Sequence, residues 1–290
     1  MLAEVIDLLA CPQCYSDQQC RSELDLVDGS AECVRGHRFD VARQGYVSLI
    51  SGGSTKFTGD SAEMIAARSR LLGSGHFKPL MDGVLSACTG TVGSDPARIV
   101  EIGSGTGQYL EYVIRGLPES RGIALDVSKF AARRAAKVHD RIGSIVADVW
   151  QPLPIRDGSL SHVLCVFAPR NGSESHRILA DDGSLVVLTP TDRHLRELVE
   201  LLGLVRVDDK KVERLGSSMA GLFEREHSED VEYAMNLSRS EVLDLVGMGP
   251  SARHLSAGQL AAAVEQLPDR TQITASATIS TYRKLTSSRP

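Results

Sequence analysis

The sequence predicts an α/β protein in which a parallel, doubly wound sheet follows a small metal-binding domain. Two observations lead to this fold class. From Ala97 onward, short apolar runs rich in β-branched residues alternate with segments of helical periodicity, the pattern of a parallel sheet covered on both faces. Near the N-terminus, Cys11, Cys14, Cys33 and His37 have the order Cys-x2-Cys, eighteen residues, then Cys-x3-His. This spacing predicts two metal-binding knuckles.

The four knuckle residues suit a zinc ion. Three thiolates and one imidazole match the tetrahedral coordination that zinc prefers, with two ligands from each knuckle. Because four protein ligands leave no open position for water, we expect the zinc ion to stabilise structure and to do no chemistry. Cys20, Cys88 and Cys165 lack knuckle spacing. A disulfide framework is the alternative, but a chain of 290 residues rarely depends on one, which favours a reduced, cytoplasmic protein.

Charge and hydropathy argue against several protein classes. The net charge of −5 argues against a general nucleic-acid coat protein. No stretch approaches the ~18 apolar residues of a membrane span, and the start, MLAEVIDLLACPQC, lacks the basic region of a signal peptide. A local basic face still allows an RNA partner: Arg35, Arg38, Arg43 and Lys56 are offset only by Asp40. Scattered solvated charges explain these residues equally well.

The composition changes twice along the chain. Residues 51–59 are rich in Gly, Ser and Thr and read as a linker, and helical spacing follows at 61–72 and 79–87. We therefore expect three parts: a zinc-binding domain at 1–50, a linker with helices at 51–95, and an α/β domain at 96–290. A zinc-binding segment this short needs its metal to fold.

The elements of the α/β domain follow one another in order. We expect strands at 97–103, 121–127, 143–149, 160–168 and 184–190. We expect helices at 106–117, 128–139, 174–179 and 192–202, with Ser128 as an N-cap. Right-handed crossovers make such a sheet doubly wound. Toward the C-terminus, alternating segments at 230–238 and 271–285 predict an antiparallel pair at one sheet edge, with helices at 240–246 and 256–266 between them.

A glycine-rich turn ends the first of these strands. Glu101, Gly103, Gly105 and Gly107 form the pattern Glu-x-Gly-x-Gly-x-Gly, in which glycines allow a tight turn and close approach of a ligand. A dinucleotide fingerprint requires a further glycine where this chain has Gln108. The acid before the first glycine suits the cationic methionine end of S-adenosyl-L-methionine (SAM) better than it suits NAD.

Two aspartates end the next two strands. Asp126 is placed to accept hydrogen bonds from both ribose hydroxyls, although N-capping of the following helix is an alternative. Asp148 lies where an adenine amino group would arrive, although it is equally an ordinary loop carboxylate. With the glycine-rich turn, this order predicts a Rossmann-like class I SAM-dependent methyltransferase, whose ligands lie at the carboxyl ends of the strands.

The fourth strand ends in Phe-Ala-Pro-Arg-Asn, at the position that faces the reacting atom in this fold. We take Arg170 and Asn171 as candidate catalytic residues, because a guanidinium fork and a side-chain amide can both orient a base edge. The alternative is that Pro169 ends the strand and Asn171 caps the helix that follows. Cys165 is interpreted as a small buried side chain.

Together these segments resemble the 23S ribosomal RNA (guanine-N1)-methyltransferases of the RlmA type over almost the whole chain. The matching segments are the zinc knuckles, GHRFDVARQGYV at 36–47, GDSAEM at 59–64, SGHF at 74–77, EIGSGTG at 101–107, LDVSK at 125–129, FAPRN at 167–171 and TPTDRHL at 189–195. The FAPRN segment is most similar to the tylosin-resistance (TlrB) subgroup.

The resemblance implies methyl transfer from SAM to N1 of a guanine in a hairpin loop of domain II of 23S rRNA, with a possible contribution to macrolide resistance. It also implies a homodimer whose zinc modules flank an RNA cleft. Carried over by position, the Zn²⁺ ligands are Cys11, Cys14, Cys33 and His37, and the cofactor contacts are Phe77, Gly105, Thr106 and His194. Phe77 stands where the family often has Tyr, and His194 read alone is a helix-surface histidine.

Two other functions fit the sequence less completely. One is a SAM-dependent methyltransferase that acts on a small molecule, with zinc only stabilising a lid. The other is a non-catalytic RNA-binding module that retains a cofactor fold. The chemistry expected for the main hypothesis is displacement at a sulfonium methyl group, in which positioning supplies much of the barrier reduction.

Overall fold

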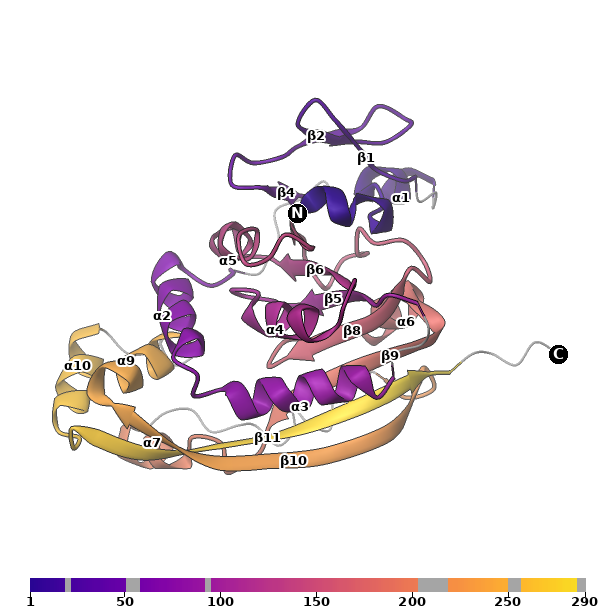
Figure 1. The fold of residues 1–290 in the computed structure, drawn as a ribbon. Helices are drawn as coiled ribbons and strands as arrows, with labels where there is room; N and C mark the ends of the chain where they lie inside the picture. The colour runs from indigo at the N-terminus through magenta and orange to yellow at the C-terminus, as the bar shows by residue number, and fades with distance from the viewer. Residues whose placement is uncertain (19–21, 51–57, 92–94, 203–218, 250–256, 286–290) are drawn as a thin grey trace.

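A central sheet of eight strands carries the fold (Figure 1). Its strands are β4 (Tyr46–Ser48), β5 (Arg98–Ile102), β6 (Arg121–Asp126), β7 (Ile142–Val146), β8 (Leu160–Val166), β9 (Leu179–Pro190), β10 (Phe223–Ser238) and β11 (Arg270–Lys284). Across the sheet they run in the order β10-β11-β9-β8-β5-β6-β7-β4. Neighbouring strands are parallel except that β11 is antiparallel to β9 and β10. The expected α/β class is confirmed.

The structure is a computed structural model that describes residues 1–18, 22–50, 58–91, 95–202, 219–249 and 257–285. Its α-helices are α1 (Pro12–Gln18), α2 (Ala62–Gly73), α3 (Lys78–Thr89), α4 (Gln108–Gly116), α5 (Lys129–Ala135), α6 (Gly172–Ile178), α7 (Arg196–Leu202), α9 (Arg239–Gly247) and α10 (Ala257–Glu265). Two 3-10 helices, η1 (Leu2–Glu4) and η2 (Ile6–Leu8), begin the chain, and β1 (Asp25–Val27), β2 (Ser30–Glu32) and β3 (Arg38–Asp40) form a small second sheet.

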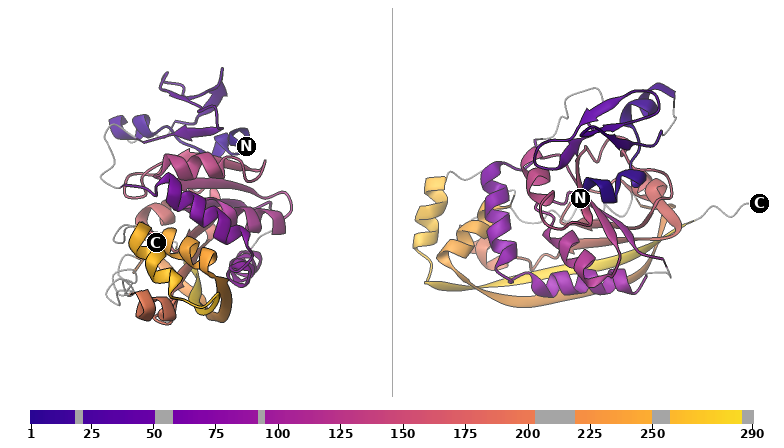
Figure 2. Two further views of the ribbon diagram at one scale, coloured as in Figure 1. Left: turned by 90° about the vertical axis from the view of Figure 1, so that its left-hand side faces the viewer. Right: turned by 45° about the horizontal axis from the view of Figure 1, so that its top comes forward.

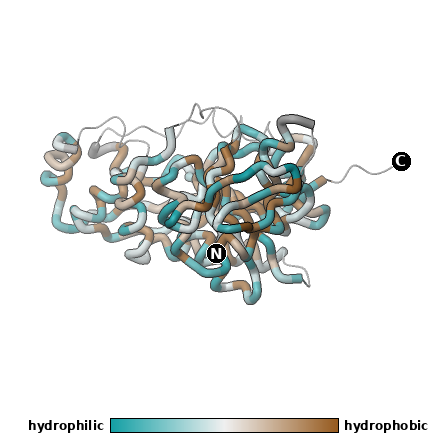
Figure 3. Tube along the Cα trace, turned by 90° about the horizontal axis from the view of Figure 1, so that it is seen from above, coloured by the Kyte–Doolittle hydropathy of each residue, from teal (hydrophilic) through white to brown (hydrophobic). Residues whose placement is uncertain are grey.

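Alternate residues of the strands build two hydrophobic cores, one on each face of the sheet. On one face, Ile99 of β5 packs with residues of α3, α4 and α9. On the other, Val100 and Ile102 pack with α6 and the N-terminal residues. Figure 2 gives two further views of the sheet and its helices, and Figure 3 shows how apolar and polar stretches alternate along the chain. The sheet is therefore buried on both faces, as a parallel sheet requires.

The long hairpin of β10 and β11 lies at one edge of the sheet, next to β9. The antiparallel pair expected from the sequence is confirmed, and its strands are longer than the alternating segments suggested. The helix expected at 192–202 is shorter, because α7 begins only at Arg196. Residues before it form a turn held to β11, where the Thr191 N–H donates to the Ser276 carbonyl and the His194 side chain accepts from the Ser276 N–H.

The zinc module, residues 1–50, is fixed to the sheet rather than tethered beside it. Its last strand, β4, pairs in parallel with β7 at the sheet edge, and Val5 fills the space above Gly143, where an added Cβ would meet its Cγ2 at 2.2 Å. Asp7 forms an ion pair with Arg121 at 2.8 Å. Residues on both sides of position 50 thus share one continuous core, and the boundary there stays a prediction.

Among the described residues, no helix has the length and apolar character that crossing a membrane requires. The predicted linker at 51–59 and Lys56 lie largely or wholly outside the described residues. The helices expected after that linker are present as α2 and α3, and the Ser61 side chain caps α2 by accepting a hydrogen bond from the Met64 N–H.

Candidate functional site

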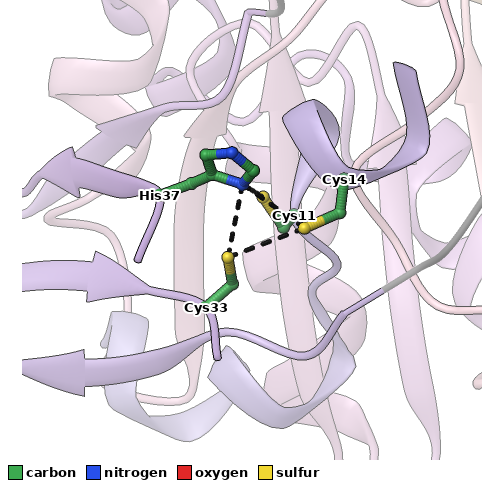
Figure 4. A group of neighbouring side chains, drawn as sticks. All are labelled: Cys11, Cys14, Cys33 and His37. Carbon is green, nitrogen blue, oxygen red and sulfur yellow. Dashed lines mark hydrogen bonds between the residues drawn. The ribbon is translucent and has the colours of Figure 1, made fainter. Parts of the chain in front are cut away.

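The four knuckle residues converge at one point of the zinc module (Figure 4). Cys11 and Cys14 lie at the start of α1, while Cys33 and His37 flank a tight turn between β2 and β3. In this turn the Gly36 N–H donates to the Cys33 carbonyl at 2.8 Å, and Gly36 has φ +80°. A glycine suits this left-handed backbone, so the local sequence favours the knuckle.

The ligand atoms are spaced as a zinc ion requires. The three sulfurs lie 3.3–3.4 Å from Nδ1 of His37, and the sulfurs of Cys14 and Cys33 are 3.7 Å apart. Metal–ligand bonds of ~2.3 Å to sulfur and ~2.0 Å to nitrogen in a tetrahedron give separations of about 3.5–3.8 Å. Although burial opposes it, the Arg35 and His37 N–H groups lower the pKa of the Cys33 thiol to about 7, which favours the metal-binding thiolate.

The glycine-rich turn joins β5 to α4 at the carboxyl edge of the sheet. Gly103, Gly105 and Gly107 have φ values of +67°, +53° and +76°, a conformation that side chains with a Cβ rarely adopt. The Gly103 and Ser104 N–H groups both donate to the Leu125 carbonyl. The turn is therefore held against β6. It ends β5, and the strand order reverses between β5 and β8, which is the ligand position of such sheets.

Two buried acids hold this turn. The Glu101 carboxylate accepts from the Leu110 N–H in the first turn of α4, and burial raises its pKa to about 8. Asp126 accepts from the Gly105 N–H at 2.8 Å and from the Ser128 N–H at 2.8 Å, and burial raises its pKa. The N-cap of α5 is Ser128. The alternative role of Asp126, capping of this helix, is therefore excluded. A bound cation or hydroxyl donors beside these acids would stabilise their charged forms.

Two further candidates lie in the loops around this turn. Thr106 is buried and its hydroxyl donates to the Gln108 side chain at 2.8 Å. Asp148, almost fully buried after β7, accepts from the Trp150 N–H at 3.0 Å. This contact holds the loop that carries the exposed indole of Trp150 beside the carboxyl edge.

Phe77 and His194 differ in their surroundings. Phe77 is only 2% exposed and packs in the core beneath α3. Packing accounts for the position of Phe77, and the cofactor contact that the family resemblance implies for it stays a prediction. His194 is not a helix-surface residue: its ring stacks on Phe167 with centroids 5.5 Å apart, and burial lowers its pKa to about 4.

Arg170 and Asn171 also differ in their surroundings. The Asn171 side chain accepts from the Glu174 N–H, which caps α6, and donates to the Val149 carbonyl at 2.8 Å. Both ends of its amide are engaged, which favours the capping alternative over a contact with a base. Arg170 is 8% exposed, its Nε has no hydrogen-bond partner, and no carboxylate of the described residues pairs with it. It is a desolvated cation at the end of β8, and burial lowers its pKa.

Comparisons with known proteins match this arrangement. The zinc-ribbon family described as RlmA, N-terminal, matches residues 9–51. The 23S rRNA (guanine(748)-N(1))-methyltransferase of Streptomyces fradiae is 41% identical over 98% of this chain and 100% of its own length. A Micromonospora griseorubida protein, also named as a 23S rRNA (guanine-N(1)-)-methyltransferase, is 40% identical over 98% of this chain and its whole length.

The chain belongs to the 23S rRNA (guanine-N1)-methyltransferase family. The N-terminal module is the zinc ribbon of this family. The sheet order and the glycine-rich turn agree with this membership.

Sequence reasoning overlooked two residues of the carboxyl edge. Phe167 has φ +51° and is 41% exposed, although it lies inside the FAPRN segment that drew attention to its neighbours. Arg68 of α2 reaches the glycine-rich turn from a helix that precedes the sheet. Only the matching GDSAEM segment beside it signalled that this helix takes part in the site.

Proposed function

We propose that this protein transfers a methyl group from SAM to N1 of a guanine in a hairpin loop of domain II of 23S rRNA. The guanine would correspond to position 748, which the name of the Streptomyces fradiae relative specifies. The observation that carries the proposal is that this chain joins a glycine-rich SAM turn and a docked zinc module in one continuous core, over the full length of that relative.

Phe167 supports a position for the guanine at the end of β8. A Cβ added to Gly103 would lie 2.8 Å from Cβ of Ala168, so the turn of Phe167 touches the glycine-rich turn directly. A non-glycine residue in the left-handed region stores strain and often marks a functional site. The exposed ring of Phe167, backed by His194, offers the aromatic face on which unpaired RNA bases stack.

When bound, SAM supplies the electrophilic methyl group. Guanine N1 carries a proton at neutral pH, so negative charge develops on the base and spreads to O6 as that proton passes to solvent water. S-adenosylhomocysteine is the leaving group of the transfer. The desolvated guanidinium of Arg170 would stabilise this charge, because a cation acts most strongly where water is excluded. The base would leave its stack at a cost of a few kcal/mol, which is lowest in a loop.

The Arg170→Ala variant is expected to lower kcat at saturating RNA by about 100-fold, the usual effect of removing one group that stabilises developing charge. Asn171→Ala is the matched control from the same loop. It should cost about 1 kcal/mol of stability through the lost cap and leave kcat close to that of the wild type. Single-turnover methylation and thermal unfolding measure both effects. Unchanged kcat in a folded Arg170→Ala protein would remove this role.

The zinc module would dock the RNA. It carries the exposed side chains of Arg35, Arg38 and Arg43, of which Arg38 pairs with Glu32 at 2.8 Å, and exposed basic side chains suit phosphate contacts. We include in the proposal a homodimer whose two zinc modules flank the RNA, action in the cytoplasm, and a contribution to macrolide resistance.

Mass spectrometry of 23S rRNA from a strain that lacks this gene tests the function. Loss of one N1-methylguanine from domain II supports the proposal, and its return with a plasmid copy assigns the loss to this protein. An unchanged modification profile would contradict it and favour a small-molecule methyltransferase. Cofactor binding without turnover on rRNA would indicate a non-catalytic RNA-binding module instead.

A further inference from the structure

Arg68 reaches from α2 over the middle of the glycine-rich turn. A Cβ built on Gly105 would lie 3.0 Å from its Nη1 and 3.2 Å from its Cδ. The guanidinium therefore closes one side of the space in front of the turn, on the face where the backbone of Gly105 is bare. The turn and α2 are separated in sequence, so this contact exists only in the folded chain.

One terminal nitrogen of this guanidinium already donates hydrogen bonds to groups of the protein. Its Nη2 donates to the Asp60 carboxylate at 2.7 Å and to the Met248 carbonyl at 2.9 Å. Its Nε is buried without a partner, and among the described residues Nη1 forms no hydrogen bond. The contacts of Nη2 fix the orientation of the planar group, and they leave Nη1, which faces the turn, without an acceptor.

The charges around the turn show what acceptor is missing. The positive charge of Arg68 acts on both buried acids of the site, Glu101 and Asp126, and opposes the rise of their pKa values. The methionine end of SAM is a zwitterion with one ammonium and one carboxylate group. An acid suits the first and a guanidinium suits the second, and charge-assisted hydrogen bonds of this kind are the strong ones.

We propose that Arg68 binds the carboxylate of the methionine end of SAM through Nη1, and so positions the methyl group toward the end of β8. The inference rests on the proposed function, because it needs SAM at the glycine-rich turn. It assigns to α2 a direct part in cofactor binding, with Asp60 and the Met248 carbonyl as the groups that orient the arginine.

Calorimetry with two product analogues tests this proposal. S-adenosylhomocysteine keeps the carboxylate, whereas S-adenosyl-3-thiopropylamine keeps the ammonium group and lacks the carboxylate. The wild type should bind the first at least about tenfold more tightly, as a hydrogen bond between charged groups predicts. In Arg68→Gln this preference should fall to within about threefold. Arg70→Gln is the control, because Arg70 lies on the same helix, is 63% exposed and pairs with Asp244.

The outcomes separate the possible roles of Arg68. If Arg68→Gln lowers the affinity for both analogues equally, the arginine only holds α2 in place and the proposal is overturned. If Arg68→Gln fails to fold, the same two affinities are measured for Arg68→Lys and for the wild type. A wild type that binds both analogues equally tightly makes no contact with the carboxylate, which overturns the proposal. If the wild type binds neither analogue, the proposed function itself fails.

Discussion

Removal of zinc is expected to abolish methylation of 23S rRNA. The Cys33→Ser variant should lose its zinc ion and most of its activity, because a structural zinc ion contributes folding free energy directly and a site of this size does not form without it. The effect should spread beyond the knuckles. Cys11, Cys14 and Cys33 belong to the same hydrophobic core as Val100 and Ile102 of β5, so loss of the module uncovers one face of the sheet.

Metal analysis, thermal unfolding and RNA binding measure this effect together. We expect less than one tenth of the wild-type zinc content, lower thermal stability, and a loss of rRNA affinity that exceeds any loss of S-adenosylhomocysteine affinity, since α4, the helix that follows the glycine-rich turn, packs in the other core. Cys88→Ala is the control: Cys88 is buried in the other core, and its loss should leave the zinc content unchanged. Full activity of a zinc-free protein would refute the assignment of a structural zinc ion.

The second large effect is expected at the glycine-rich turn. Gly103→Ala should weaken S-adenosylhomocysteine binding by about 100-fold. Gly103 has φ +67° and its added Cβ would lie 2.8 Å from Cβ of Ala168, so the substitution adds a left-handed strain of roughly 1–2 kcal/mol to a steric clash with the Ala168 side chain. The turn must then move away from the end of β8, which displaces the cofactor from the proposed guanine position.

The Gly221→Ala variant separates the effect of backbone strain from the effect of a steric clash. Gly221 has φ +76° and no atom within 4 Å of an added Cβ, so this variant carries the strain alone, far from the turn. Its stability should fall by roughly 1 kcal/mol, while its affinity for S-adenosylhomocysteine should stay at the wild-type value. Calorimetry on both variants measures the difference. Equal losses of affinity would mean that the close contact with Ala168 has no part in shaping the site.

The parts of the fold with strong periodicity could be predicted from the sequence. The strands of the α/β domain, the cap at Ser128 and the antiparallel hairpin of β10 and β11 are all where their patterns placed them. The pairing of β4 with β7 could not be predicted, because three residues show no periodicity and their partner lies about a hundred residues away. Pairing between distant segments depends on tertiary packing.

The site could be predicted in part, for a similar reason. Spacing alone located the four zinc ligands and the glycine-rich turn, because residues close in sequence build each knuckle and the turn. The burial of Phe77 depends on what packs around it, and the hydrogen bond from the Asn171 side chain to the Val149 carbonyl joins two separate loops. The approach of Arg68 to Gly105 likewise exists only after folding. No local pattern encodes these contacts.

Methylation of guanine N1 in 23S rRNA is the property of this protein that most needs a direct test. The most direct measurement incubates the purified protein with radiolabelled SAM and an unmodified transcript of domain II, and then maps the product by reverse transcription. A methyl group on N1 blocks base pairing, so the account predicts incorporated label and one new stop at the guanine that corresponds to position 748 of the relative. Absence of label, or label without a stop at a guanine of that loop, would contradict it.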